Sequence, residues 1–465
     1  MNNSFLPAIM LMLVSAGCVS VPEKGGFDQL GENASERVAA ELVWPGARLS
    51  EDEADVRIRT LLSAPLTETA AIEIAILKSP TIQAEYFKLQ AAAGEYVDGA
   101  SLPNPFVSAM VLDVESEPVT NLSYGLGLDL FDILFFPRRI TAAGLRFEAE
   151  QAETAAALID YISEVRVAYY NAVAATQISN LMTSASEAAG ASVDFAQALF
   201  DAGNIAQINL DREKLMAAEI AFDAMRAQTE LNTARARLNA LTGLAGRASG
   251  DPTLSGRLRH PTSEIVVETV NVDENLYLIA DDARIDEAGA LIGLDSVSSL
   301  IGEMELEFER ERDDGEWERG IGVAFSLPVF NWGGGRRQAV RAKLSAMIQE
   351  RLATKAQLES EKQILLSEFE TAQQIALRYR AEVLPLAGRV LQGAQLDYNA
   401  MQIGTLALLD AKRDQLSAGR NYVRILQDYW VLRARYDQLA AGGSARGFVG
   451  QQRTPSSGSL ERGGH

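Results

Sequence analysis

Residues 304–327 read MELEFERERDDGEWERGIGVAFSL, and their alternation is the strongest indication of strands in the sequence. In both halves apolar residues alternate with acidic or small ones, which predicts two strands with one apolar face each. The turn sequence 313–316 (DDGE) lies between the halves and makes them a hairpin. The apolar positions are Met304, Leu306, Phe308, Ile321, Val323, Phe325 and Leu327; the interleaved positions are Glu303, Glu305, Glu307, Glu309, Gly322, Ala324 and Ser326.

An earlier stretch predicts a second hairpin around the turn sequence 115–118 (ESEP). Its second strand alternates in the same way, and its first is less regular. The second strand has Leu122, Tyr124, Leu126, Leu128 and Leu130 between Ser123, Gly125, Gly127 and Asp129; the first has Phe106, Ser108, Met110, Leu112 and Val114.

Each strand has about ten residues, which suits a tilted transmembrane β-strand with lipid on one face and a pore lumen on the other. A soluble half-buried sheet shows the same alternation, so the pattern alone leaves both interpretations open. Aromatic residues crowd the strand-to-helix junctions, as an interfacial belt does, and favour the membrane interpretation. They are Phe131, Phe135, Phe136, Phe330 and Trp332.

Four strands cannot close a barrel alone, because barrels need about eight strands or more and open edges are not tolerated in lipid. The membrane interpretation therefore requires several copies of the chain. If the apolar residues face lipid, the four glutamates 303, 305, 307 and 309 face the lumen. Rings of carboxylates bias which ions enter a pore, so we expect a cation-preferring lumen.

The chain is duplicated at long range. Arg138-Arg139 is echoed by Arg336-Arg337, and 234–237 (ARAR) by 432–435 (LRAR). Each half has the same plan of a strand segment, a long helix, a turn and a second long helix. We expect residues 66–240 to be the first repeat, with hairpin 104–131 and helices 138–199 and 205–241. Residues 241–440 are the second, with hairpin 302–328 and helices 336–400 and 405–440.

The long helices show coiled-coil spacing. Eight positions separated by steps of 4, 3, 4, 3, 4, 3 and 4 form a heptad seam: Leu365, Phe369, Ala372, Ala376, Tyr379, Val383, Leu386 and Val390. Pro385 lies within this run and predicts a kink or local unwinding. Gly203 and Gly404 are expected to supply the positive φ that lets each helix reverse. A further helix is expected over residues 66–99.

The N-terminus resembles a lipoprotein signal. An apolar run over residues 5–14 is too short to span a bilayer and is typical of the core of a signal peptide, residues 1–17. Small residues precede Cys18, the candidate lipidation site; an ordinary secretory signal with an accidental cysteine is the alternative. We expect residues 18–65 to be a loosely packed lead-in and residues 441–465 to be a disordered tail.

Composition excludes most other functions. The 465 residues carry 42 Lys and Arg against 63 Asp and Glu, a net charge of −21, which argues against a nucleic-acid partner. Two His and one Cys leave little for acid–base catalysis, a disulfide or a metal cluster. We therefore expect no catalytic residue, cofactor or metal site, and the chain is not expected to be an enzyme.

Several motifs resemble those of TolC-like outer-membrane efflux factors. Residues 322–331 (GVAFSLPVFN) with Gly335-Arg336-Arg337 resemble the strand-to-helix junction of that family's second repeat. Residues 128–132 (LDLFD) through Pro137-Arg138-Arg139 resemble the junction of the first. Residues 102–105 (LPNP) resemble the start of the first strand in the heavy-metal branch. Residues 404–416 (GTLALLDAKRDQL) are similar to the stretch past the periplasmic helix turn.

The resemblance covers residues 66–440 and implies an α+β membrane protein. It implies a lipid-anchored homotrimer in the outer membrane of a Gram-negative bacterium. Its twelve-stranded barrel, with four strands from each protomer, continues into a long periplasmic coiled-coil barrel of helices. It also implies a passive conduit that works with a periplasmic adaptor and an inner-membrane pump, in efflux or type I secretion. Acidic residues line the periplasmic aperture in that family, and Asp410 matches the motif; Asp414 and Asp211 are weaker candidates.

Two other functions compete with a channel. A lipid-anchored periplasmic scaffold or adaptor would keep the heptads but would leave the two alternating hairpins without a purpose. An enzyme on a helical scaffold would need a cluster of catalytic groups that the sequence does not show. The sequence does not identify the cargo, and small molecules, metal cations and exported peptides all remain open.

Overall fold

The computed structural model describes residues 51–113, 120–246, 252–254, 256–262, 270–301, 304–313, 316–325 and 332–444. The expected signal peptide, Cys18 and Glu303 lie outside the described residues. The described part divides into two compact units. The first contains Tyr86–Ala155 and Leu276–Gln357; the second contains residues 51–85, Ala156–Asn275 and the described residues from Leu358 on.

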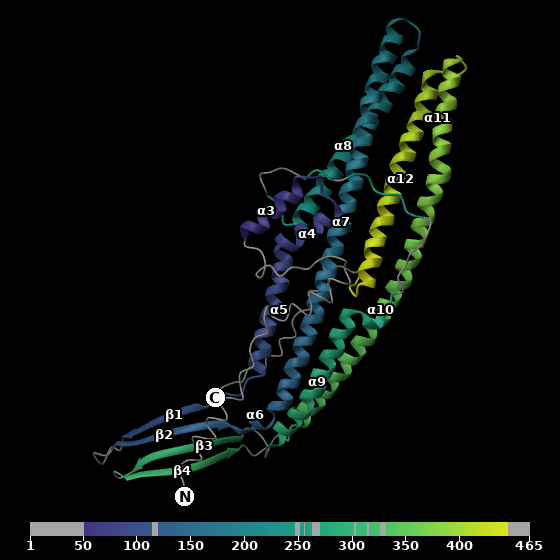
Figure 1. Cartoon of the computed structure of the whole chain (residues 1–465). Coiled ribbons are helices and arrows are strands. Elements are labelled where there is room, and N and C mark those ends of the chain that lie inside the picture. The colour runs from purple at the N-terminus through teal and green to yellow at the C-terminus, as the bar shows by residue number, and fades with distance from the viewer. Residues whose placement is uncertain are drawn as a thin grey trace. The chain divides into compact units, whose positions relative to one another are not determined.

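The first unit contains one four-stranded antiparallel sheet (Figure 1). Its strands are β1 (Phe106–Asp113), β2 (Thr120–Asp129), β3 (Met304–Asp313) and β4 (Glu316–Phe325), in the order β1-β2-β3-β4. The two expected hairpins thus join through β2 and β3, each from a different half of the chain. Among the described residues, strands β1 and β4 each have one neighbour, so both edges of the sheet are open there.

The first unit also contains α6 (Leu130–Leu134) and α9 (Leu276–Ile301). It includes α5 (Pro80–Gly99) from Tyr86 on and the first parts of α7 (Phe136–Asp201) and α10 (Gly334–Arg378). The short helix α6 begins directly after β2 because Asp129 caps it: its carboxylate accepts a hydrogen bond from the backbone N–H of Asp132 at 3.0 Å. Helix α7 has 66 residues, about 99 Å at the α-helical rise.

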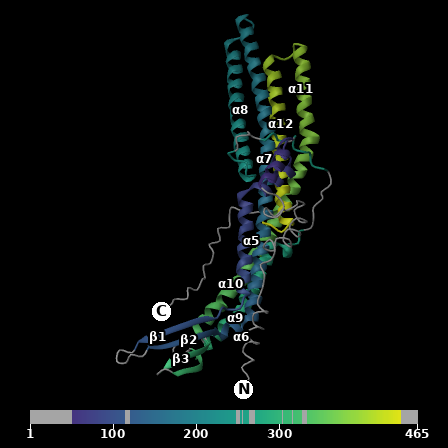
Figure 2. The same cartoon turned by 60° about the vertical axis from the view of Figure 1, so that its left-hand side comes forward.

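The second unit is built from helical hairpins, which Figures 1 and 2 show side by side. Its other elements are α3 (Glu51–Leu62), α4 (Glu68–Lys78), α8 (Gln207–Leu241), the short helix η2 (Val272–Glu274), the π-helical turn η3 (Tyr379–Val383), α11 (Leu384–Asn399) and α12 (Thr405–Ala440). Its core packs α7 and α8 around Ile178, Met182 and Ala227, and α10 against α12 where the rings of Phe369 and Tyr429 stack at 5.3 Å. None of the described helices is long and apolar enough to cross a membrane.

Three expected segments differ from the structure. The single helix over 66–99 is two helices, because Ser79 has an extended backbone and Pro80 starts α5 where its missing N–H costs nothing. The lead-in contains helix α3. The first residues of the expected tail belong to the fold: Asn275 donates to the Gly443 carbonyl at 2.8 Å, and the backbone N–H of Ser444 donates to Asp160.

The two turns between the long helices differ in the residue that takes the left-handed conformation, which is glycine only in the first repeat. Gly203 has φ +75°, as expected. The expectation of a positive φ at Gly404 is wrong: its φ is −81° and it is the N-cap residue of α12. Met401 takes the left-handed conformation instead, with φ 58°. Either residue type can end a helix in this way, but a side chain there costs free energy that glycine avoids.

Pro385 acts through the turn that precedes it. The π-turn η3 ends at Val383, just before Pro385, and inserts one extra residue into the helical repeat. The expected seam is buried up to Ala376 but exposed at Leu386 and Val390. The less exposed positions after the turn include a seam moved one residue later, at Leu384, Ala387, Leu391, Ala394 and Tyr398. The proline therefore shifts the seam rather than ending the helix.

Candidate functional site

The sheet has one acidic face. Residues directly opposite each other on antiparallel strands point to the same side, so the register places Glu305, Glu307 and Glu309 together. Their cross-strand neighbours are the small or acidic residues Gly125, Gly127, Asp129, Gly320, Gly322 and Ala324. We call this side the acidic face. The side chains of the three glutamates therefore have mostly small residues beside them on the neighbouring strands.

Two side chains of β1 occupy part of the space above the glycines of β2. The Ser108 hydroxyl donates to Oε1 of Glu307 at 3.4 Å, across Gly125. The ring of Phe106 lies over Gly127 and leaves no room there for a Cβ. Phe106 and Met110 are thus on the acidic face, and the apolar side of β1 is formed by Val107, which is 76% exposed, and Val111. The phase expected for this strand from the sequence, with Phe106 and Met110, therefore lies on the acidic face and not on the apolar one. The alternation misleads here because both phases of this strand contain apolar residues.

The opposite side of the sheet, which we call the apolar face, is exposed along its central row. Its central row comprises Val107, Leu126, Phe308 and Ile321 across the four strands. Ile321 is 72% exposed. A continuous row of solvent-exposed apolar side chains indicates a surface that binds lipid or a partner. At the helical end, Phe131 and Phe135 pack at 4.5 Å and Trp332 is 64% exposed. Apolar rows bounded by aromatic residues are typical of a surface in contact with lipid.

Toward the hairpin ends the apolar face changes character. The next two rows contain the exposed arginines Arg310, Arg312 and Arg319, which we call the arginine row. The Arg310 guanidinium lies 4.8 Å from the centroid of the Trp317 ring, on which Tyr124 stacks at 6.1 Å. Sequence reasoning missed this group, although the signal was present as basic residues in the apolar phase after Phe308.

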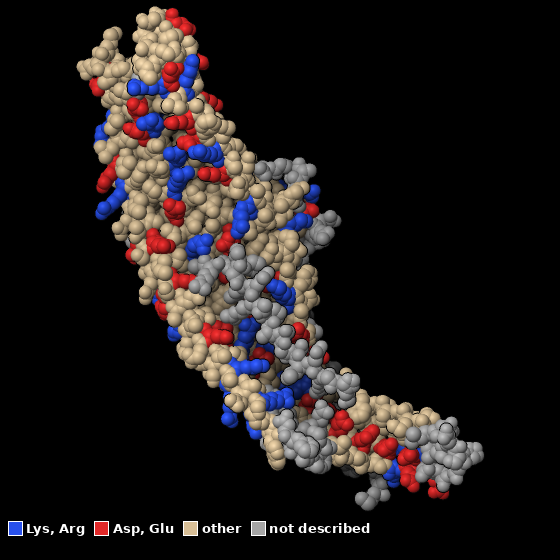
Figure 3. Space-filling view, turned by 180° about the vertical axis from the view of Figure 1, so that it is seen from behind, with Lys and Arg blue, Asp and Glu red and all other residues tan. Residues whose placement is uncertain are grey.

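Charge of both signs is visible on the surface in Figure 3. Acidic side chains gather on the part of the sheet that this view shows. On the helices, acidic and basic side chains alternate. The sheet is therefore the part of this view where carboxylates are concentrated.

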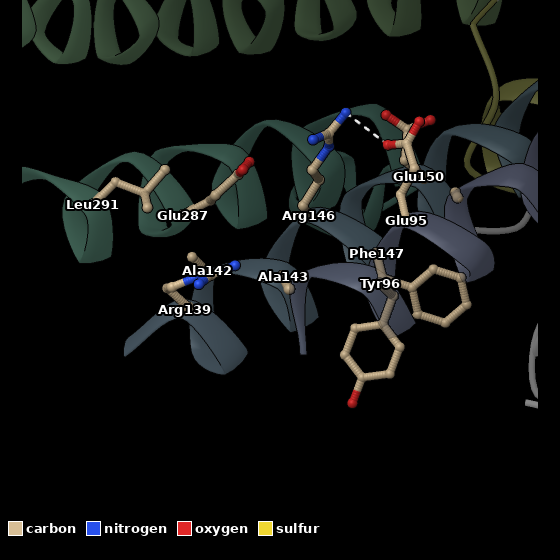
Figure 4. Close-up of a pocket in the computed structure, with 12 residues that line it drawn as sticks. Glu95, Tyr96, Arg139, Ala142, Ala143, Arg146, Phe147, Glu150, Glu287 and Leu291 are labelled. Carbon is tan, nitrogen blue, oxygen red and sulfur yellow. Dashed lines mark ion pairs between the residues drawn. The ribbon is translucent and has the colours of Figure 1, made fainter. Parts of the chain in front are cut away.

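A cavity of about 220 Å³ lies among the helices of the first unit (Figure 4). Helices α5, α7 and α9 line it, and its stacked aromatic pair is Tyr96 and Phe147, with ring centroids 5.5 Å apart. Arg146 forms an ion pair with Glu95 at 2.8 Å, drawn as a dashed line in Figure 4. Glu287 also lines the cavity, and burial raises the pKa of its carboxyl against the opposing influence of Arg146 and Arg284.

The three expected aperture residues lie near the helical turns of the second unit, all exposed. Asp410 and Asp414 are four residues apart on α12 and share one side of it, with Arg413 3.6 Å from Asp410. Asp211 is on α8, where Gln207 donates to its carboxylate at 2.8 Å. The structure brings Asp410 and Asp414 together, and joins neither to Asp211 by a hydrogen bond or ion pair. Within the described residues, no group of three or more His, Cys, Asp or Glu could hold a metal ion.

Comparison with known sequences identifies similar proteins. Residues 71–247 match the family described as outer membrane efflux protein. The cobalt-zinc-cadmium resistance protein CzcC of Cupriavidus metallidurans is 23% identical over 384 residues, which cover 81% of this chain and 90% of CzcC.

Solved structures with the same fold include two outer-membrane proteins. The CmeC outer membrane channel of Campylobacter jejuni aligns with a TM-score of 0.70 and 15% identity over 81% of this chain and 86% of CmeC. The outer membrane protein VceC of Vibrio cholerae aligns with a TM-score of 0.66 and 18% identity over 81% of this chain and 96% of VceC. The long helices and the four-stranded sheet thus form a known architecture.

Proposed function

We propose that the chain is an outer-membrane efflux protein, as the match of residues 71–247 to that family suggests, and that three copies form a passive channel through the outer membrane. The observation that carries the proposal is the sheet. It has one apolar face, one acidic face and two open edges. In lipid an open edge is excluded, so β4 of one copy must pair with β1 of the next. Three copies of four strands close a barrel of the size that encloses a lumen.

The helices support the same assembly. An exposed apolar stripe runs along α8 through Ile208, Leu215, Phe222 and Met225, on the side away from its core. Ile208, Leu215 and Phe222 are separated by seven residues each and Met225 follows three residues later, a spacing typical of a seam that packs against another helix. On α11, Leu386 and Val390 are also exposed. Two different surfaces of one chain suit a head-to-tail ring, in which each copy contacts the next through unlike faces.

The acidic face then lines the lumen, and the apolar face contacts lipid. We propose that Glu305, Glu307 and Glu309 form the carboxylate ring of this lumen; Glu303, the fourth expected residue, lies outside the described residues. The proposed cargo is small molecules or metal cations, since carboxylates attract cations and the similar protein CzcC is a cobalt-zinc-cadmium resistance protein. A periplasmic adaptor and an inner-membrane pump are the proposed partners, and acylation of Cys18 the proposed anchor.

We place the aperture at the helical turns, with Asp410 as its principal carboxylate. Three copies would bring three Asp410 side chains together, and divalent cations bridge such carboxylates. Asp410→Ala should therefore reduce block of the channel by cobalt added from the periplasmic side. Unchanged block would remove Asp410 from the aperture, while Asp414→Ala and Asp211→Ala serve as comparisons.

The assembly itself is tested first. Isolated outer membranes are extracted with detergent, and the mass of the extracted protein is measured before and after heating. We expect a heat-labile trimer that conducts ions in planar bilayers. A protein released without detergent, or a monomer without conductance, would contradict the channel and favour a periplasmic scaffold with a soluble sheet.

A further inference from the structure

The arginine row lies on the apolar face, just beyond its apolar residues toward the hairpin ends of the sheet. Arg310 and Arg319 are direct cross-strand partners and share the apolar face with Tyr124. Arg312 and Trp317 form the next row. The rows are about 7 Å apart along the strands, and neighbouring strands about 4.8 Å. Three guanidinium groups thus project from a small patch just beyond the apolar rows.

No carboxylate of the described residues neutralises this patch. Arg310 and Arg319 are like charges directly opposite each other, an arrangement that destabilises a sheet unless an anion lies between them. Within the part of the chain that the structure describes, none of the three arginines forms an ion pair. The glutamates beside them in sequence, Glu309, Glu311 and Glu318, point to the acidic face because side chains alternate along a strand. This is notable in a chain of net charge −21.

The aromatic residues orient the patch. Trp317 holds the Arg310 guanidinium against its ring, and Tyr124 extends the stack. Trp and Tyr prefer the boundary between hydrocarbon and head groups, so they fix the depth of the arginines at that boundary. Guanidinium groups bind phosphate oxygens in pairs and at this depth meet the phosphates of lipids.

We propose that Arg310, Arg312 and Arg319, with Trp317, bind the phosphate groups of an anionic lipid at the outward side of the barrel. The occupant is a lipid rather than a free anion, because the apolar residues of the same face continue below the arginines and suit acyl chains. Several arginines within one patch match a lipid with more than one phosphate. The inference rests on the proposed function, since it requires the apolar face to lie in a membrane.

The test uses native mass spectrometry of the full chain in detergent, titrated with lipid A carrying two phosphates and, separately, with the form carrying one. The wild-type chain should bind the bisphosphorylated form more tightly. The variant R310Q/R312Q/R319Q should bind it about tenfold to a hundredfold more weakly, since each basic side chain near an anionic surface contributes to binding. R310K/R312K/R319K should fall between, because it keeps the charge and loses paired hydrogen bonding.

A matched variant controls for net charge. R212Q/R226Q/R389Q removes three exposed arginines from helices of the second unit and should bind lipid A like the wild type. Equal loss in this control, or unchanged binding in the arginine-row variant, overturns the inference. So does displacement of lipid A by equimolar inorganic phosphate or by a hexaglutamate peptide.

The channel and the lipid site can fail separately. A wild-type chain that extracts only as a monomer contradicts the channel itself. A wild-type trimer that conducts ions but shows no preference for the bisphosphorylated lipid contradicts only the lipid site. Conductance of the arginine-row variant shows that it has folded. If the glutamine variant does not assemble, the lipid affinity of the lysine variant decides the outcome, and an affinity equal to that of the wild type overturns the inference.

Discussion

At the scale of single residues, the two helical turns place different residue types in the left-handed conformation that ends the first helix of each pair. Gly203 and Met401 both have a left-handed backbone, but only Met401 carries a side chain, and that side chain is 93% exposed. Met401→Gly should stabilise the chain by about 1 kcal/mol, because it removes the left-handed penalty and no packing. Gly203→Ala should destabilise by about 1 kcal/mol, since a Cβ there meets nothing within 4 Å and only the backbone is strained. Thermal unfolding followed by circular dichroism checks both, and shifts of the same sign would contradict the explanation.

Glu287 gives the stability of the chain a pH dependence. Its raised pKa means that the folded chain keeps this proton at a pH where the unfolded chain has lost it. The free energy of unfolding therefore falls as the pH rises from the ordinary value of 4.5 through the raised pKa. Glu287→Gln should flatten this dependence and raise the thermal midpoint at neutral pH. Glu148→Gln, an exposed position on α7, should leave the dependence as in the wild type. If the stability of the wild type and of Glu287→Gln depends on pH in the same way, the raised pKa of Glu287 is not the cause of this dependence.

At the scale of elements, strand β3 concentrates the charge of the proposed pore. Replacing Glu305, Glu307 and Glu309 together by glutamine should lower the cation-to-anion permeability ratio severalfold, because the ring of carboxylates is removed. Reversal potentials in a salt gradient measure this ratio. Glutamine at the exposed helical positions Glu219, Glu230 and Glu350 removes the same charge and should have little effect. Anion preference in the wild-type channel would exclude the acidic lumen.

The same elements show what the sequence can predict. Period-two alternation is a local property, so it predicts all four strands, and it assigns the apolar and acidic phases of β3 correctly. The phase of β1 needs the register, because Phe106 covers a glycine of a neighbouring strand. The seam after Pro385 needs the π-turn, which moves every later residue by one position. The conformation of Gly404 depends on where the turn places its single left-handed residue.

At the scale of the whole molecule, assembly should depend on the α8 stripe. Leu215→Glu with Phe222→Glu puts two charges into the proposed seam, and burying an unpaired charge is strongly unfavourable. The unheated detergent extract should then lose the trimer band. Ser184→Glu adds a charge to the exposed side of α7 and should leave the trimer intact. A trimer of normal heat stability in the double variant would place the interface elsewhere.

The open edges of the sheet have a genetic consequence. Because β1 and β4 must each find a strand in another copy, no chain builds its part of the wall alone. A variant that folds and pairs through one edge but cannot pair through the other would enter mixed rings and leave them unsealed. When such a variant is expressed beside the wild-type protein, most rings contain at least one defective copy. Loss of the channel should therefore be dominant for lesions at one edge and recessive for lesions that prevent synthesis of the chain.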